Sequence, residues 1–146
     1  MLHKYQHRLP HWELKGAYYF ITFTISDDAL TSAEIRLVRD QIIQGHGKWN
    51  VLVAVQVMPD HVHLIIRPDD EVTLGRAMKW IKGSTARLVN KTRERQGTLW
   101  TIDYYDRIIR HQQELDEKLK YMYENPLRAG LTGDPAHYKG WYFQES

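Results

Sequence analysis

The 146-residue sequence contains no cysteine and no long apolar run. Without cysteine the chain can form neither a disulfide nor a thiolate metal site. No apolar run approaches the roughly 20 residues of a membrane-spanning helix. The first residues, MLHKYQHRLPHWELKG, lack the apolar segment of a secretory signal. We therefore expect a cytoplasmic protein with no membrane contact.

Internal repeats, low-complexity tracts and linkers are also absent from the sequence, so we predict that residues 1–146 form a single domain. Hydrophobic residues make up 42% and charged residues 26% of the chain, as in an ordinary globular protein. The formal net charge of +2 does not by itself indicate a partner. The stretch 76–95, RAMKWIKGSTARLVNKTRER, is strongly basic, with Glu94 as its one acid. Such a block is typical of a surface that contacts nucleic-acid phosphates, or of a solvated helix.

Apolar patterns predict seven elements in the order β-α-β-β-α-β-α. A capping box, Thr31 with Glu34 three residues later, begins the first helix. Pro126 ends the last helix, because the residue before a proline avoids helical geometry. The predicted elements are strand 17–26, a helix from Thr31 to Gly45, strands 50–58 and 61–67, helix 73–92, strand 99–110 and helix 112–125. The first six match the α+β ferredoxin-like or RRM-like fold, βαββαβ, an antiparallel sheet with two helices on one face, and a C-terminal helix follows.

Two histidines stand one residue apart in MPDHVHLII, residues 58–66. Side chains alternate across a strand, so His61 and His63 project from one face and the apolar residues that alternate with them project from the other. Two imidazoles about 7 Å apart along a strand can bind one divalent ion if a third ligand comes from elsewhere. The pattern alone also permits buried structural histidines.

The run HVHLII partly resembles the histidine-triad nucleotide hydrolases, in which three histidines alternate along a strand and one is the nucleophile. Position 65 is isoleucine here, so the third histidine is missing. We therefore favour a metal-binding pair over a histidine nucleophile.

A second group of functional candidates lies in KYMYENP, residues 120–126. At about 100° per residue, Tyr123 falls on the apolar stripe of the last predicted helix, whereas Tyr121 and Asn125 stand together on a neighbouring face. We expect Tyr123 to pack in the core and Tyr121 to be accessible. Taken alone, the pattern indicates no more than an amphipathic tyrosine and a residue near a helix end.

In combination, PDHVHLII, GTLWTIDYYDRIIR and YMYENPLRAGL resemble the single-tyrosine HUH transposases. The resemblance is nearest to the REP-associated tyrosine transposases of bacteria, relatives of the small insertion-sequence enzymes. It extends from RLPHWELKGAYYFITF, residues 8–23, through the C-terminal tail. It implies the βαββαβ core with the nucleophile on a C-terminal helix. The family often has Asn where Asp60 precedes the first histidine, so we assign Asp60 no role.

The resemblance implies a catalytic site made of Tyr121, His61 and His63. The two histidines match the pair that binds a divalent metal, Mg²⁺ or Mn²⁺, and Asn125 occupies the place of the residue that completes the metal site. Tyr121 matches the nucleophile that cleaves and rejoins DNA through a 5′-phosphotyrosine. The residues that assist proton transfer are left open among Glu117, Lys118 and His111.

The substrate implied by the resemblance is single-stranded DNA with a palindromic hairpin repeat. Basic side chains of the stretch 76–95 are candidates for phosphate contacts and one tryptophan for base stacking, namely Lys79, Lys82, Arg87, Lys91, Arg93, Arg95 and Trp80. Trp100 is expected in the core. Four N-terminal residues are further candidates: His3, Lys4, His7 and Arg8. The resemblance favours a monomer over a homodimer.

Three other kinds of protein share parts of this pattern. A non-catalytic nucleic-acid-binding domain would keep the fold, but the intact set of His61, His63, Tyr121 and Asn125 argues against it. A replication-initiator-like HUH nickase shares the chemistry, but the tail NPLRAGL favours a transposase. A metal-dependent phosphodiesterase would use the same histidines without Tyr121.

Overall fold

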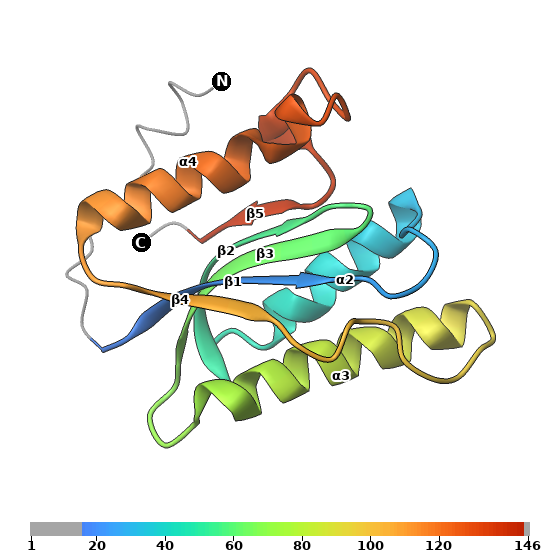
Figure 1. The fold of residues 1–146 in the computed structure, drawn as a ribbon, viewed down its shortest axis with the longest axis horizontal. Helices are drawn as coiled ribbons and strands as arrows, with labels where there is room; N and C mark the ends of the chain where they lie inside the picture. The colour runs from blue at the N-terminus through green and yellow to red at the C-terminus, as the bar shows by residue number, and fades with distance from the viewer. Residues whose placement is uncertain (1–15, 145–146) are drawn as a thin grey trace.

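The structure, a computed structural model, describes residues 16–144, in which one antiparallel sheet carries helices on both faces (Figure 1). The strand order is β4-β1-β3-β2-β5, and every neighbouring pair is antiparallel. The elements are β1 (Tyr18–Thr24), α2 (Ser32–Gln44), β2 (Asn50–Val57), β3 (His61–Pro68), α3 (Leu74–Thr92), β4 (Tyr105–Ile109), α4 (Gln112–Arg128), the 3-10 helix η1 (Pro135–His137) and β5 (Trp141–Phe143). The order of the first four strands confirms the ferredoxin-like prediction.

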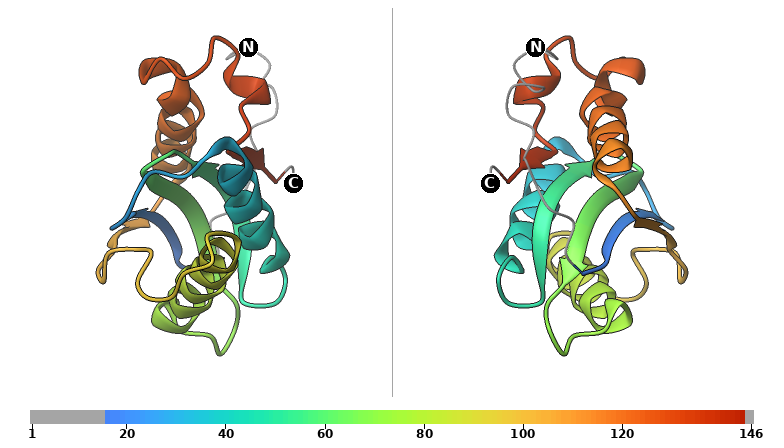
Figure 2. Two further views of the ribbon diagram at one scale, coloured as in Figure 1. Left: turned by 90° about the vertical axis from the view of Figure 1, so that its right-hand side faces the viewer. Right: turned by 90° about the vertical axis from the view of Figure 1, so that its left-hand side faces the viewer.

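Both faces of the sheet are buried, each against different helices (Figure 2). On one face α2 and α3 pack against Ile21, Leu64 and other strand residues. On the other face α4 packs against Phe20 and Ile65. Because His61 and His63 alternate in step with Ile65, they face α4, and the apolar residues between them face α2 and α3 as predicted.

The start of α2 follows from its sequence. Thr31 Oγ1 accepts a hydrogen bond from the Glu34 N–H at 3.2 Å, and Glu34 Oε1 accepts one from the Thr31 N–H at 2.9 Å. The predicted capping box is therefore confirmed. α3 begins in a similar way, because Thr73 Oγ1 accepts from the Arg76 N–H.

The fourth strand is shorter than predicted. Only Tyr105–Ile109 pair with β1, and residues 99–104 leave the sheet after a single bridge between Trp100 and Ile25. The carbonyls of Thr101 and Ile102 instead accept hydrogen bonds from Lys82 Nζ, at 2.6 and 2.8 Å. A lysine of α3 therefore holds backbone oxygens that a longer strand would pair with its neighbour.

The helix α4 continues through Pro126 to Arg128, so the prediction that it ends at Asn125 is wrong. A proline inside a helix has no N–H to donate to the carbonyl four residues earlier, here that of Met122. In β2, Gln56 Nε2 donates to this carbonyl at 2.9 Å, in a buried position. The sheet thus supplies the donor that the proline lacks, and the helix gains a further turn.

The C-terminal elements η1 and β5 were not predicted. The three residues of β5 extend the sheet beyond β2, and Gly140 before it lies against the β2 backbone, where Val57 N–H donates to Gly140 O at 2.9 Å. Among residues 16–144, no helix is long and apolar enough to cross a membrane.

Candidate functional site

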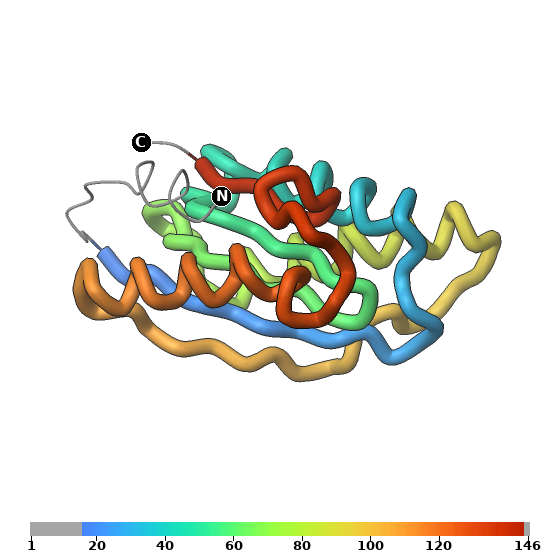
Figure 3. Tube along the Cα trace, turned by 90° about the horizontal axis from the view of Figure 1, so that it is seen from above, coloured from blue at the N-terminus to red at the C-terminus, as the bar shows by residue number. Residues whose placement is uncertain are grey.

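The two histidines and the tyrosine meet where α4 runs lengthwise over β1 and β3 (Figure 3). His63 lies opposite Thr22 on β1 and opposite Gln56 on β2. The Tyr121 ring stands edge-on to His63, with 5.5 Å between ring centroids, and the His61 and His63 rings are 4.7 Å apart. The sheet contributes the imidazoles and the helix contributes the phenol.

The imidazole of His63 is fixed from two sides. Its Nδ1 lies 2.8 Å from Thr22 Oγ1, and its ring stacks on Phe20 with 5.4 Å between centroids. Its Nε2 is buried and has no hydrogen-bond partner within residues 16–144. When Nδ1 donates its proton to Thr22, Nε2 carries the free lone pair.

Burial, followed by the positive charges of His61, Arg128 and Lys118, lowers the pKa of His63 to about 3. The His63 ring is therefore neutral at physiological pH. A neutral imidazole is the form that binds a metal ion or accepts a proton.

The side chain of His61 is half-buried and has a partner on each nitrogen. Its Nδ1 lies 2.6 Å from Asp60 Oδ1, and its Nε2 lies 3.3 Å from Asn125 Oδ1. An ionised carboxylate only accepts hydrogen bonds, so the contact with Asp60 places a proton on Nδ1, and Nε2 faces the amide oxygen of Asn125 on α4. Asp60, to which the sequence assigned no role, thus orients His61.

The two tyrosines of α4 differ as predicted. Tyr123 is buried at 2% exposure in the core between α4 and the sheet, whereas Tyr121 is 45% exposed. Asn125 follows Tyr121 by one helical turn and meets His61. The structure therefore brings together all four residues predicted for the site: His61, His63, Tyr121 and Asn125.

The last turn of α4 adds a cation to this group. The Arg128 guanidinium lies 4.5 Å from the centroid of the Tyr121 ring and donates to the Tyr121 carbonyl at 2.6 Å. Lys118, three residues before Tyr121, places its Nζ 4.9 Å from the centroid of the Phe20 ring. The sequence pattern missed Arg128 because the helix was expected to end before it.

Other residues of the site also escaped prediction. Thr22 and Phe20 hold His63, but nothing local in β1 indicates which of its residues pair with β3. Gln56 has an ordinary place in a strand, and its role depends on Pro126. A cavity of about 350 Å³ lies beside Thr22 at the edge of the sheet where β1 meets β4, lined by Thr22, Phe23, Thr24, Asp103, Tyr104 and Tyr105.

The residues predicted to assist proton transfer have different positions. His111 is the N-cap of α4, and its Nδ1 accepts from the Glu114 N–H at 3.4 Å. Glu117 is exposed, one turn before Tyr121. Lys118 is the member of the three that acts electrostatically on His63. A role of any of them in proton transfer stays a prediction.

The residues predicted to contact DNA lie mainly on α3, on the face of the sheet opposite to α4 (Figure 1). Lys79, Arg87 and Lys91 are exposed there. Lys82 is turned toward the carbonyls of residues 101 and 102, and burial lowers its pKa. The structure therefore does not bring these residues together with the histidine–tyrosine site, and their contact with DNA stays a prediction.

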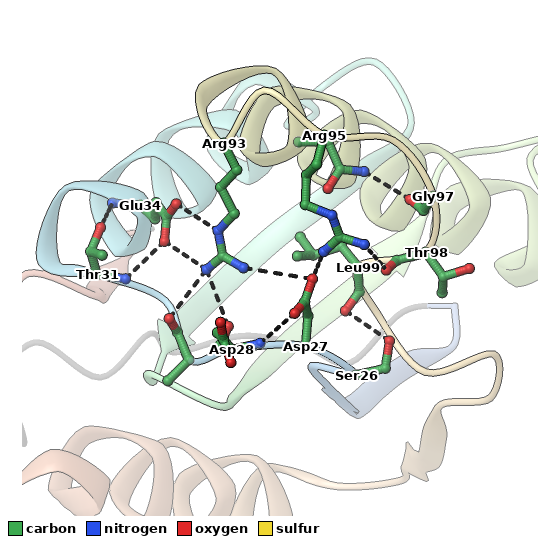
Figure 4. Close-up of polar contacts among 12 residues, drawn as sticks. Ser26, Asp27, Asp28, Thr31, Glu34, Arg93, Arg95, Gly97, Thr98 and Leu99 are labelled. Carbon is green, nitrogen blue, oxygen red and sulfur yellow. Dashed lines mark hydrogen bonds and ion pairs between the residues drawn. The ribbon is translucent and has the colours of Figure 1, made fainter.

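Two further DNA candidates, Arg93 and Arg95, belong to a network of ion pairs after α3 (Figure 4). Arg93 donates to both carboxylate oxygens of Glu34 at 2.8 Å, and Arg95 pairs with Asp27. The hydrogen bond from Arg93 is the largest effect that lowers the pKa of Glu34. The network ties the α2 capping box to the end of α3 and occupies these guanidinium groups.

The tryptophans have separate environments. Trp100 is buried in the core as predicted, with its Nε1 donating to Thr85 Oγ1 at 2.9 Å. Trp80 is half-buried and stacks on Trp49 with 6.0 Å between ring centroids. The N-terminal candidates His3, Lys4, His7 and Arg8 lie outside the described residues.

Solved transposases share this fold. A REP-associated tyrosine transposase bound to a REP hairpin has a TM-score of 0.69 at 19% identity, and the match covers 86% of this chain and 76% of that one. A transposase from Deinococcus radiodurans R1 has a TM-score of 0.50 at 21% identity, covering 77% of this chain and 92% of the other. At these identities the likeness establishes the fold alone.

The sequence establishes the family. Residues 17–125 match the family described as Transposase IS200 like, which covers most of the chain and all of the site residues. A protein of Haemophilus influenzae named as a REP-associated tyrosine transposase is 28% identical over 133 residues, covering 81% of this chain and 74% of that protein. The chain belongs to the IS200-like transposase family, which confirms the resemblance noted in its sequence.

Proposed function

We propose that this transposase cleaves and rejoins single-stranded DNA by transesterification, with Tyr121 as the nucleophile. The observation that carries the proposal is the accessible Tyr121 phenol beside His63, an imidazole whose buried Nε2 is without a partner among the described residues. A tyrosine serves well in a reversible reaction, because a phenolate is both an adequate nucleophile and a better leaving group than the alkoxide of serine.

In the proposed step, Tyr121 Oη attacks a backbone phosphorus. A bond forms between phosphorus and Oη, and the bond between phosphorus and the 3′ oxygen breaks. The phenol proton leaves as the bond forms, and the departing 3′ oxygen takes up a proton to become a hydroxyl. The product is a 5′-phosphotyrosine, and attack by another 3′-hydroxyl reverses the step and joins two DNA ends without ATP.

The proposed cofactor is a divalent ion, Mg²⁺ or Mn²⁺. Nε2 of His61, Nε2 of His63 and the amide oxygen of Asn125 would hold it, and the buried, unpartnered Nε2 of His63 fits this use. Thr22 and Asp60 fix the opposite nitrogens of the two rings, as partners of metal-binding histidines commonly do. A bound ion would polarise the non-bridging oxygens of the phosphate.

The proposed substrate carries a hairpin, because a solved protein of the same fold is bound to a REP hairpin. Activity as a monomer stays a prediction that rests on the resemblance to the REP-associated transposases. A location in the bacterial cytoplasm agrees with this substrate.

The test is to incubate the protein with 3′-labelled DNA that forms a hairpin with randomised single-stranded flanks, in Mn²⁺ or Mg²⁺. We expect a protein–DNA adduct that survives denaturing electrophoresis, and sequencing of the captured DNA identifies the cleaved phosphate. Tyr121→Phe should form no adduct, and Tyr123→Phe is the matched control. An adduct with Tyr121→Phe contradicts the nucleophile assignment, and cleavage without attachment supports a hydrolytic phosphodiesterase.

A further inference from the structure

One face of α4 carries a line of polar residues that extends beyond the proposed catalytic group. Lys118, Tyr121, Asn125 and Arg128 are spaced by three, four and three residues, which places them on one side of the helix. The two cations are about 15 Å apart along the helix axis, with the nucleophile and the amide between them. This line exists because α4 passes through Pro126.

The position of Arg128 is fixed toward the tyrosine. Its guanidinium lies over the Tyr121 ring at 4.5 Å, and its Nη2 donates to the Tyr121 carbonyl at 2.6 Å. Its side chain is 43% exposed, and a guanidinium has five N–H donors in a planar fork that suits two phosphate oxygens. Donors therefore remain available on the solvent side, next to the phenol.

Lys118 is placed on the other side of the tyrosine. Its Nζ lies 4.9 Å from the Phe20 ring centroid, and the same Phe20 stacks on His63 and meets Tyr121 edge-on. The lysine thus reaches over the sheet beside the histidine pair. It presents a positive charge to the space above that pair.

The acids on α4 leave the two cations mostly uncompensated. Glu114 accepts from Arg107 and from the Arg110 N–H, at the start of the helix. Glu124 lies 3.5 Å from Arg128 in an exposed pair of the kind that contributes little, roughly 0–1 kcal/mol. Asp116 accepts a hydrogen bond from Gln112 Nε2 at 2.9 Å, and Glu117 is exposed at the helix surface.

We propose that Arg128 and Lys118 bind the backbone phosphates on the two sides of the phosphate that Tyr121 attacks, so that the DNA strand runs along α4. This inference rests on the proposed function and adds the path of the substrate. A strand held at both flanks presents the phosphorus between them to the phenol and to the histidine pair, and such positioning is a major part of catalysis of phosphoryl transfer.

The first test measures binding alone, in the Tyr121→Phe background and without divalent metal. Fluorescence anisotropy with the labelled randomised-flank hairpin gives the dissociation constant over a range of NaCl concentrations. We expect Arg128→Gln and Lys118→Gln each to weaken binding by about fivefold and to reduce the salt slope by about 0.7, the value for one lost phosphate contact on a single strand. Lys120→Gln is the matched control, because Lys120 is an exposed lysine of the same helix that points about 100° away from Tyr121.

A second test locates the contacts on the DNA. Once the cleaved phosphate is known, neutral methylphosphonates replace the phosphates around it one at a time. The parent protein should lose about fivefold in affinity at the phosphate that Arg128 contacts, and Arg128→Gln should lose nothing further at that position. An equal loss in both proteins at every position contradicts the proposal.

Each outcome separates the role in DNA binding from a role in helix stability. A structural role alone would lower the thermal midpoint of Arg128→Gln and leave the salt slope unchanged, and an unchanged slope overturns the proposal. If Arg128→Gln does not fold, Lys118→Gln decides: its salt slope should still fall by about 0.7, whereas an unchanged slope contradicts the proposal. The binding test needs no cleavage, so reduced slopes without any adduct would refute the proposed reaction while supporting the phosphate contacts.

Discussion

The hydrogen bond from Gln56 Nε2 to the Met122 carbonyl replaces the one that the backbone of Pro126 cannot donate. We predict that it stabilises the protein for this reason. Replacing Gln56 by Leu keeps the size and burial of the side chain but leaves that carbonyl in the core without its donor. An unsatisfied buried polar group costs about 1–3 kcal/mol. Gln56 Oε1 itself has no hydrogen-bond partner within residues 16–144, so its removal offsets part of this cost. We expect a loss near the lower end, about 1–2 kcal/mol in the free energy of unfolding.

Introducing Gln56→Leu into a protein that already carries Pro126→Ala tests whether the missing N–H of Pro126 causes this loss of stability. Alanine restores an N–H that can donate to the Met122 carbonyl, as in an uninterrupted helix. Gln56→Leu should then cost less by about 1 kcal/mol, which is the coupling between the two positions. The four proteins of this double-mutant cycle can be compared by urea unfolding, followed by tryptophan fluorescence and circular dichroism. An equal cost of Gln56→Leu in both backgrounds, within about 0.5 kcal/mol, would refute the reasoning.

Three further predictions concern other parts of the molecule. Glu34→Gln should destabilise the protein by about 2–4 kcal/mol at pH 7. Because the pKa of Glu34 is lowered in the fold, the ionised carboxylate stabilises the protein above the ordinary value of 4.5, and this stabilisation is lost as the pH falls below it. The difference in free energy of unfolding between wild type and Glu34→Gln, measured by urea unfolding, should therefore become smaller toward pH 3. Gly140→Ala should detach β5, since a Cβ there would overlap the Val57 carbonyl oxygen; unaltered amide exchange protection in β5 would contradict this. Thr22→Val should weaken Mn²⁺ binding about 10-fold to 100-fold by calorimetry, because His63 loses the partner that orients it, and unchanged affinity would exclude that role.

The parts of the fold that the sequence predicted are those with local causes. Alternation in β3 assigned His61 and His63 to one face, and helical spacing separated Tyr121 from Tyr123. Both assignments need only the geometry of a single element. The partners of the histidines could not be predicted in this way, because Thr22 meets His63 through the pairing register of two strands.

The errors have the same origin. The rule that a helix ends before proline is local, whereas the donor that lets α4 pass Pro126 comes from Gln56, on a different element. The composition of residues 99–104 favours a strand, but Lys82 of α3 takes up their carbonyls. In both places a side chain distant in sequence replaces a backbone hydrogen-bond donor. The residue pattern of the segment itself therefore cannot predict this hydrogen bond.

The two covered faces of the sheet also restrict how a long substrate can lie on the protein. The sheet separates α3, with its basic residues, from α4, which carries Tyr121 (Figure 2). At the β5 edge of the sheet, α4 is in contact with β5, because Tyr123 packs edge-on against Trp141. At the β4 edge the cavity beside Thr22 stays open. A nucleic acid that touched both α3 and Tyr121 could not lie flat on one face and would have to bend around the sheet, and the cavity at the β4 edge offers one path.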